Sequence, residues 1–203
     1  MSALTYKIIT ERLLIRCYDP NDAALLQEAI DESLEHLKPW MPWTTQEPES
    51  AAQKARRLEV FREEFERGID FAFGIFSKDE QVLLGSTGLH TRIGPDAREI
   101  GYWIHAEYLR RGYALETVVA LCKVGFEIEG LQHIEIHCAS DNTRSQGIPS
   151  KLGFQLIRTE KSTDGDTYEM IWSLSKEAYL ECAWKNVRLE AYDAKGVLIN
   201  PGH

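Results

Sequence analysis

The chain has 203 residues, 43% of them hydrophobic and 27% charged, which is the balance of one globular domain with a substantial core. Its formal net charge of −9 argues against broad binding to nucleic acid, which needs a basic surface, and is compatible with a cationic substrate. No apolar run approaches the roughly 18 residues of a membrane span, and residues 1–7 lack the layout of a signal peptide, so we expect no membrane partner and a cytoplasmic location.

The first elements in chain order are a strand and two helices joined by an aromatic loop. Apolar and β-branched residues predict a strand over residues 6–18. Asp19 and Pro20 are typical of a helix start, which predicts a helix from residue 21 to about residue 33. Three prolines exclude a regular helix from residues 37–48, and apolar residues at helical spacing predict the second helix over residues 50–67.

The middle of the chain is typical of an antiparallel sheet followed by a helix. Strands are predicted over residues 71–77, 81–91 and 99–105, with turns at residues 78–80 and 94–96. The next helix, over residues 114–128, is predicted by one apolar stripe at helical spacing, and Gly130 ends it.

The last third alternates strands with helices. A strand is predicted over residues 133–139 and a helix over residues 142–152. Strands over residues 154–159 and 168–174 form a hairpin across a turn at residues 163–166, and a helix over residues 176–187 follows. We therefore predict one domain over residues 1–187, a mixed α/β (α+β) fold with a largely antiparallel, twisted sheet flanked by helices, and leave residues 188–203 as an unassigned tail.

The segment Leu109-Arg110-Arg111-Gly112-Tyr113-Ala114 is the strongest candidate for a binding site. A predicted strand leads into this basic loop, and the loop opens an amphipathic helix. The N-terminus of a helix presents unpaired N–H groups and a positive dipole end, so it can bind a phosphate. A surface loop with two solvated arginines is the alternative, and one glycine does not separate the two.

This loop resembles the acetyl-CoA pyrophosphate loop of the GNAT acyltransferase superfamily, usually Q/R-x-x-G-x-G/A. Other segments follow in that family's order and are similar to its ribosomal-protein N-terminal acetyltransferase (RimJ/RimL-like) branch: Thr10-Glu11-Arg12-Leu13-Leu14-Ile15-Arg16, Leu37-Lys38-Pro39-Trp40-Met41-Pro42-Trp43, Asp141-Asn142-Thr143-Arg144-Ser145 and Lys151-Leu152-Gly153-Phe154. The resemblance covers about residues 5–180. It implies a GNAT fold, acetyl-CoA as the acetyl donor and a primary amine as the acceptor, with no metal.

The resemblance also assigns residues to tasks. Backbone amides of the loop would hold the pyrophosphate, the strand before it would pair with the pantetheine arm, and Ser145 would protonate the leaving thiolate. The aromatic loop would line the acceptor pocket with Trp40 and Trp43, although ordinary packing explains these tryptophans equally well. The implied cofactor-binding residues are Trp103, Ile104, His105, Arg110, Arg111, Gly112, Tyr113, Ala114, Leu115, Asn142 and Lys151.

Two positions depart from the family's pattern. Leu109 replaces the usual Gln or Arg at the first position of the loop, which a cradle made of backbone tolerates. Pro149 stands where many members carry a tyrosine used as general acid, and proline cannot fill that role. Proline also removes the N–H that would bond the carbonyl of Ser145 in a regular helix. We therefore expect an irregular or late-starting helix here, with Ser145 as the better candidate acid.

Direct attack of a neutral amine on a thioester needs a base for the ammonium proton, an oxyanion site and a proton for the thiolate. The candidate bases are Glu99, His105, Glu135, His137 and Asp141. We favour Glu99, which shares a strand face with Trp103. Deprotonation through water needs no dedicated residue and stays open.

Other functions and sites remain as alternatives. The acceptor is predicted to be a protein N-terminal α-amine; a small amine such as an amino acid, polyamine or antibiotic is the second choice. A non-catalytic acyl-CoA-binding protein and a phosphate-binding module are alternatives of other classes, and a homodimer stays open. His133 and His137 are about 13 Å apart along a strand, too far to share one ion. The cysteines match no zinc or redox pattern and are predicted to be buried apolar residues; they are Cys17, Cys122, Cys138 and Cys182.

Overall fold

The computed structural model describes residues 4–162 and 167–200, so the turn predicted at residues 163–166 lies outside the described residues. The described strands form a single sheet in the order β7-β8-β6-β5-β4-β3-β2-β1-β9. The strands are β1 (Lys7–Ile9), β2 (Leu13–Cys17), β3 (Ala72–Ser77), β4 (Leu83–His90), β5 (Ala97–Ile104), β6 (His133–Ala139), β7 (Gln155–Lys161), β8 (Tyr168–Ser175) and β9 (Glu190–Tyr192). Among the described strands only β5 and β6 pair in parallel, so the prediction of a largely antiparallel sheet is confirmed.

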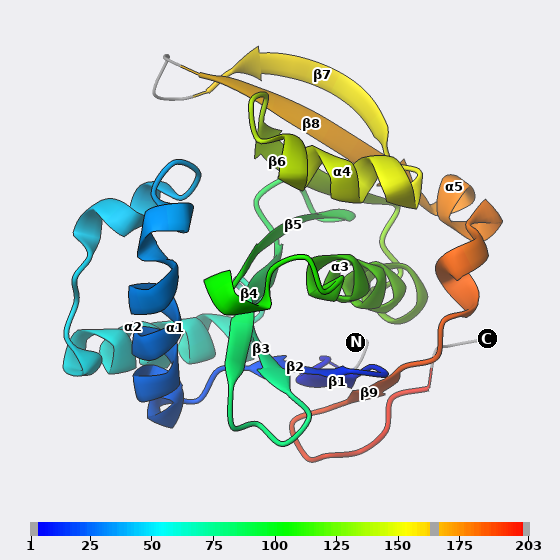
Figure 1. The fold of residues 1–203 in the computed structure, drawn as a ribbon. Helices are drawn as coiled ribbons and strands as arrows, with labels where there is room; N and C mark the ends of the chain where they lie inside the picture. Colours follow the sequence, from blue (N-terminus) through cyan, green and yellow to red (C-terminus); the bar gives the residue numbers. More distant parts are fainter. Residues whose placement is uncertain (1–3, 163–166, 201–203) are drawn as a thin grey trace.

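Helices cover both faces of the sheet. The α-helices are α1 (Ala23–Leu37), α2 (Ala51–Glu66), α3 (Tyr113–Lys123), α4 (Thr143–Leu152) and α5 (Lys176–Glu181). Shorter helical segments are η1 (Pro20–Asp22), η2 (Pro42–Gln46), η3 (Ala106–Tyr108), the π-helical η4 (Val124–Glu129) and η5 (Ala183–Asn186). The sheet curves around α3, with α4 beside it, while α1 and α2 lie together at another side of the molecule (Figure 1).

The core divides into two buried clusters along these layers. Val118, Val119 and Cys122 of α3 are buried in the larger cluster, which confirms the predicted buried stripe at these positions. Leu26 and Ile30 of α1 belong to the second cluster, on the other face. Neighbouring residues of β5 take part in different clusters because side chains alternate along a strand, so this strand contacts both layers.

Capping residues explain where the first two α-helices begin. Asp19 caps η1, which leads directly into α1, as the sequence predicted, although α1 continues to Leu37 rather than ending near residue 33. Ser50 caps α2 and forms a reciprocal capping box with Gln53.

The strand predicted over residues 6–18 is two strands. β1 and β2 pair as an antiparallel hairpin, with Lys7 opposite Arg16. Thr10 makes the turn, because its Oγ1 accepts a hydrogen bond from the Leu13 N–H at 3.0 Å and its own N–H bonds the Leu13 carbonyl. The sequence prediction missed this turn because a threonine turn lacks the glycine or proline that marks most turns.

Three further predictions need correction. α4 begins at Thr143 and runs to Leu152 through Pro149, so the helix does not start late. The helix predicted over residues 176–187 ends at Glu181 and continues only as η5. The unassigned segment contributes β9, which pairs with β1 and extends the sheet.

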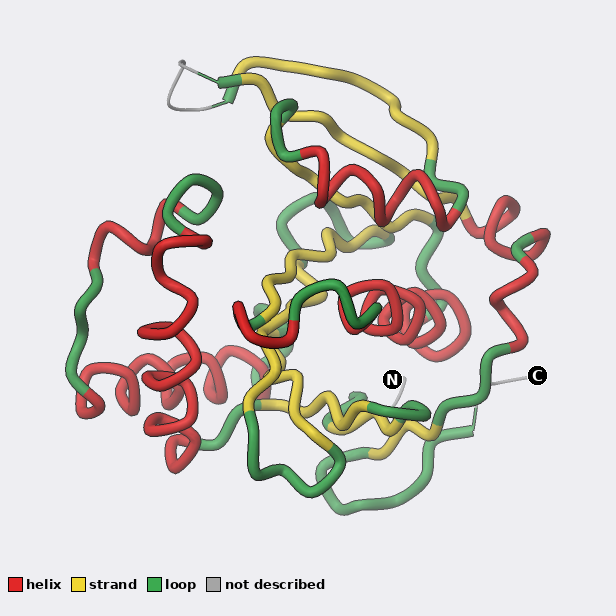
Figure 2. The backbone as a smooth tube through the Cα atoms, in the orientation of Figure 1, coloured by secondary structure: helices red, strands yellow, loops and turns green. Residues whose placement is uncertain are grey.

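The pairing between β5 and β6 is short, and this short pairing creates the candidate site. Only Ala97, Arg98 and Glu99 have partners in β6, so the two strands separate beyond Glu99. Beyond this separation, β5 is followed by the loop that leads to α3, and β6 is followed by the connection that leads to α4 (Figure 2). On the opposite side of β5, Gly85 allows β4 to lie close to β5, because a Cβ added at Gly85 would be 2.2 Å from the carbonyl oxygen of Trp103.

Candidate active site

The loop between β5 and α3 has the backbone shape of an anion cradle. Arg110 has φ 61° and Gly112 has φ 82°, so both adopt the left-handed conformation. Gly112 is the N-cap of α3 without any side-chain cap, and the helix begins at Tyr113. The first N–H groups of such a helix lack intrahelical acceptors and concentrate positive potential. Arg110, Arg111 and Gly112 are exposed, so the loop that was predicted to bind phosphate is accessible from solvent.

A second element braces this loop from the turn between β1 and β2. Arg12 Nη1 donates to the carbonyl of Arg111 at 2.7 Å, and the Arg12 guanidinium lies over the Tyr113 ring at 4.9 Å. Glu116 in the first turn of α3 accepts from Arg12 Nε at 2.6 Å, from the Arg12 N–H at 3.0 Å and from Thr10 Oγ1 at 2.6 Å. We call these residues, Thr10, Arg12 and Glu116, the hairpin brace. Sequence reasoning identified this segment only as a motif and did not assign it a role.

The open edge of β5 is set by its register with β4. Ile104 pairs with Gly85, and the His105 N–H donates to the Leu84 carbonyl at 2.9 Å. Hydrogen bonding alternates along an antiparallel strand, so Trp103 also directs its backbone groups toward β4. Tyr102 and Ile104 direct theirs toward the separated edge. His36 of α1 contacts the Ile104 carbonyl there at 3.0 Å.

This register corrects part of the predicted cofactor set. The amide of His105 is bonded to β4, so His105 cannot offer it to a pantetheine arm. Its ring is also engaged: Nδ1 accepts from the Glu107 N–H at 3.2 Å and Nε2 lies 3.2 Å from Glu32 Oε2. His105 is buried, and we drop it as a base. The strand amides that face the opening belong to Ile104, which was predicted, and to Tyr102, which was not.

The start of α4 brings three polar side chains together. Asn142 caps the helix, because its Oδ1 accepts the N–H of Ser145 at 3.1 Å, which leaves its Nδ2 as a donor. The Tyr102 hydroxyl lies 3.2 Å from Ser145 Oγ and 3.2 Å from the Ser145 carbonyl oxygen. Cys138 of β6 is buried nearby, and burial raises the pKa of its thiol. A protonated thiol is a poor nucleophile, which is consistent with direct attack of an amine rather than a covalent enzyme intermediate.

Glu99 lies in a charged cluster on the opposite face of β5. Its carboxylate accepts from Arg92 at 2.7 and 2.5 Å, and His137 Nδ1 lies 3.6 Å away. Burial alone would raise the pKa of Glu99, but the Arg92 hydrogen bonds and the His137 charge lower it overall. A base matched to neutral pH needs a raised carboxyl pKa, so this environment disfavours Glu99 as the base. Glu135 pairs with His137 at 2.8 Å, and Asp141 is exposed.

The aromatic loop contacts the same strand. The rings of Trp43 and Trp103 lie 6.3 Å apart between centroids, and both residues belong to the α1–α2 cluster. A fully buried ion pair between Lys54 and Glu47, 2.6 Å long, ties the end of the loop to α2. Trp40 is half-buried. Of the two predicted acceptor residues, Trp43 thus lies beside β5 on the face opposite to Tyr102.

The remaining predicted residues are more dispersed. Lys151 is exposed in the last turn of α4, far along the helix from Asn142. Leu109 packs against the larger core cluster and so serves the loop as an apolar anchor. Cys17, Cys122 and Cys138 are buried and Cys182 is half-buried, and all four are free thiols.

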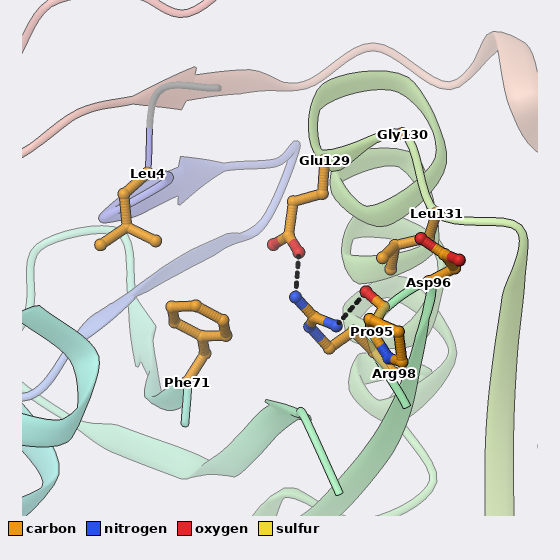
Figure 3. Close-up of a pocket in the computed structure, with 8 residues that line it drawn as sticks. All are labelled: Leu4, Phe71, Pro95, Asp96, Arg98, Glu129, Gly130 and Leu131. Carbon is orange, nitrogen blue, oxygen red and sulfur yellow. Dashed lines mark hydrogen bonds and ion pairs between the residues drawn. The ribbon is translucent and has the colours of Figure 1, made fainter. Parts of the chain in front are cut away.

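A small cavity of about 160 Å³ lies beside the first residues of β5 (Figure 3). Phe71, Arg98 and Glu129 line it, and Arg98 reaches Glu129 at 3.5 Å.

Within residues 4–162 and 167–200, no group of three or more His, Cys, Asp or Glu could hold a metal ion. No helix in that part of the chain is long and apolar enough to cross a membrane.

The chain is similar to known acetyltransferases. The family model described as the acetyltransferase (GNAT) domain matches residues 12–155. The uncharacterized N-acetyltransferase YoaA of Bacillus subtilis is 28% identical over 172 residues, covering 82% of this chain and 95% of YoaA. The [ribosomal protein uS5]-alanine N-acetyltransferase of Escherichia coli is 25% identical over 151 residues, covering 73% and 78%.

Solved structures show the same fold. Mycobacterium smegmatis RimJ, in complex with a CoA disulfide, superposes with a TM-score of 0.78 at 18% identity and covers 91% of this chain and 94% of its own. RimL, a ribosomal L7/L12 α-N-protein acetyltransferase in complex with coenzyme A, gives 0.75 at 19% identity, with coverage of 84% and 97%.

Proposed function

Because the chain belongs to the GNAT acetyltransferase family, we propose that it moves the acetyl group of acetyl-CoA to a protein N-terminal α-amine. Members of this family are N-acetyltransferases that use acetyl-CoA, and this chain is an N-acetyltransferase. The acceptor class is supported by the Escherichia coli relative, whose name specifies the alanine of a ribosomal protein. The single observation that carries the proposal is the exposed left-handed loop at the N-terminus of α3, beside the open edge of β5.

The geometry of this chain fits acetyl-CoA at two places. The uncapped first turn of α3, with Arg110 and Arg111 before it, would hold the pyrophosphate through backbone N–H groups and positive charge. The edge amides of Tyr102 and Ile104 would pair with the pantetheine arm or stabilise the thioester oxygen as negative charge develops on it. Nδ2 of Asn142 is a further donor beside this edge.

The reaction is a direct attack by the neutral amine on the thioester carbonyl. The new C–N bond forms, the C–S bond breaks, and the thiolate needs a proton. Ser145 is the proposed donor: its hydroxyl proton passes to sulfur, and water returns a proton to Oγ. The ammonium proton leaves through water, because the lowered pKa of Glu99 disfavours that carboxylate as the base.

Binding of the donor can be measured without turnover. Gly112→Glu places a carboxylate at the cradle and a side chain at φ 82°, which L residues rarely adopt. We expect isothermal titration calorimetry to show acetyl-CoA binding to the wild type and none to this variant. Unchanged binding would remove the loop from the site. Gly94→Glu is the matched control, because Gly94 also has positive φ and open space in another loop.

The acceptor is tested by turnover. Free CoA release is followed with peptides that begin with alanine or serine, and with polyamines, amino acids and an aminoglycoside. We expect the highest kcat/KM for a peptide. A preference for a small amine would overturn the acceptor class, and no turnover with any amine would indicate an acyl-CoA-binding protein. Ser145→Ala should lower kcat by about 10²-fold or more with little effect on acetyl-CoA affinity.

A further inference from the structure

Tyr102 of β5 touches the start of α4 at two atoms of the same residue. Its hydroxyl lies 3.2 Å from the carbonyl oxygen of Ser145 and 3.2 Å from the Oγ of Ser145. The tyrosine side chain lies on the face of β5 that packs against α3 and α4, within the larger core cluster. The hydroxyl is thus the described link between the strand that offers the edge amides and the residue proposed to protonate sulfur.

Pro149 explains why this carbonyl needs a partner. In an α-helix the N–H of residue i+4 bonds the carbonyl of residue i, and the residue four positions after Ser145 is Pro149. Proline has no N–H, so the Ser145 carbonyl lacks its helical donor although α4 continues to Leu152. The Tyr102 hydroxyl donates to that carbonyl in place of the missing amide.

The donor roles of the two hydroxyls follow from this assignment. A carbonyl oxygen can only accept, so the single phenol proton is directed to it. The contact between the hydroxyls is then made by the Ser145 proton, which donates to the phenol oxygen. Burial raises the pKa of Tyr102, so the phenol stays protonated and this arrangement holds across the physiological range.

We propose that Tyr102 is a positioning residue that holds the hydroxyl of Ser145 toward the reacting thioester. The proposal rests on the proposed function, because it presupposes that Ser145 protonates the thiolate. The tyrosine fixes the distance between β5, whose edge amides face the thioester, and the first turn of α4. The phenol oxygen of Tyr102 is also a weak acceptor for the hydroxyl proton of Ser145. That proton can therefore turn to the developing thiolate, which is a much stronger acceptor.

Tyr102→Phe is the first test, because it removes the hydroxyl and keeps the ring in the core. We expect kcat to fall about tenfold, with KM for acetyl-CoA and its calorimetric Kd changed by less than about twofold. On a Ser145→Ala background the same substitution should change kcat by less than about twofold, because residues that act through one another are not additive.

Pro149→Ala separates positioning from helix repair. It returns an N–H to the Ser145 carbonyl, so the pair Tyr102→Phe and Pro149→Ala should recover the Tm lost in Tyr102→Phe while kcat stays low. Tyr179→Phe is the matched control: Tyr179 is buried, its hydroxyl donates to Glu127, and it lies in α5 outside the site. It should lower Tm without changing kcat.

The outcomes distinguish the two claims. An active wild type whose kcat is unchanged by Tyr102→Phe overturns the role of Tyr102 alone. Recovery of kcat together with Tm in the double variant also overturns it, because the tyrosine would then serve only the helix. A wild type that acetylates no amine overturns the proposed function and this inference together.

Discussion

At the scale of single residues, the two faces of β5 place ionisable groups in opposite states. Tyr102 faces the helices, where burial raises its pKa and keeps it a neutral donor. Glu99 faces the other way, where Arg92 and His137 outweigh burial and keep it a carboxylate. A lowered pKa means that Glu99 contributes stability above its ordinary pKa of 4.5, and that this stability is lost as pH falls through its folded-state pKa.

Glu99→Gln is therefore expected to weaken the fold near pH 7 and to reduce the loss of stability at acid pH. The lost charged hydrogen bonds predict a decrease of about 1.5–3 kcal/mol in the free energy of unfolding at pH 7. Urea unfolding at pH 7 and in steps below pH 4.5 measures both effects. The wild type and variant should converge as the pH falls; parallel curves would contradict the ion pair.

Glu129, which lines the cavity of Figure 3, is a control because its pKa is shifted in the direction opposite to that of Glu99. Burial raises its pKa and the Arg98 charge only partly compensates, so ionising it destabilises the fold as pH rises. Glu129→Gln should leave stability at pH 7 unchanged or higher. A loss equal to that of Glu99→Gln would show that the pKa directions are wrong.

At the scale of elements, the loop proposed to bind phosphate is hydrogen-bonded to a hairpin that is about a hundred positions earlier in the chain. Arg12 donates a hydrogen bond to the carbonyl of Arg111. The carboxylate of Glu116, in the first turn of α3, accepts hydrogen bonds from Thr10 and Arg12. The left-handed Arg110 and Gly112 are thereby held next to an ordered helix N-terminus. We therefore expect the hairpin brace to affect the proposed phosphate binding at this loop, although it would not contact the phosphate itself.

Arg12→Met removes the brace while keeping the side chain's length. We expect the calorimetric Kd for acetyl-CoA to rise about 5–20-fold, which corresponds to about 1–2 kcal/mol. Arg62→Met is the matched control, because Arg62 is equally exposed (42% against 44%) and is also paired with carboxylates, on α2. An equal loss of affinity in both variants would show a general effect of lost charge rather than a brace.

At the scale of the whole molecule, the candidate active site is formed by a strand of the sheet and by the two helices that follow β5 and β6. β5 and β6 are neighbours over three residue pairs and then separate, and the donor would contact β5, α3 and α4 at once. A ligand that bridges elements in this way stabilises the native state relative to the unfolded chain.

Acetyl-CoA at a hundredfold excess over its Kd should therefore add about 2.7 kcal/mol and raise Tm by about 5–10 °C. ATP and inorganic phosphate should give a clearly smaller shift in differential scanning fluorimetry, since they reach only the loop. An equal shift with ATP would favour the alternative of a general phosphate-binding module. Gly112→Glu should abolish the shift while keeping a cooperative transition.

The sequence alone determined the order and type of nearly all elements, because caps, apolar stripes and turn residues act locally. It also predicted a phosphate-binding role for the loop from Arg110 to Ala114, because that role would depend on backbone groups at a helix start. Apart from the local turn at Thr10, what it missed at the candidate site depends on contacts between distant segments. The register of β5 on β4 decides that Ile104 and Tyr102, and not His105, face the opening.

Tertiary contacts also decided the consequences of single residues. Pro149 predicted an irregular or late-starting helix from local rules, but α4 starts at Thr143, and the hydroxyl of Tyr102 supplies the missing hydrogen bond from another element. The lowered pKa of Glu99 depends on Arg92 and His137, whose positions relative to it are set by the folded sheet. Local chemistry can be read along a chain, whereas hydrogen-bond partners and charges across strands exist only once the sheet has brought them together.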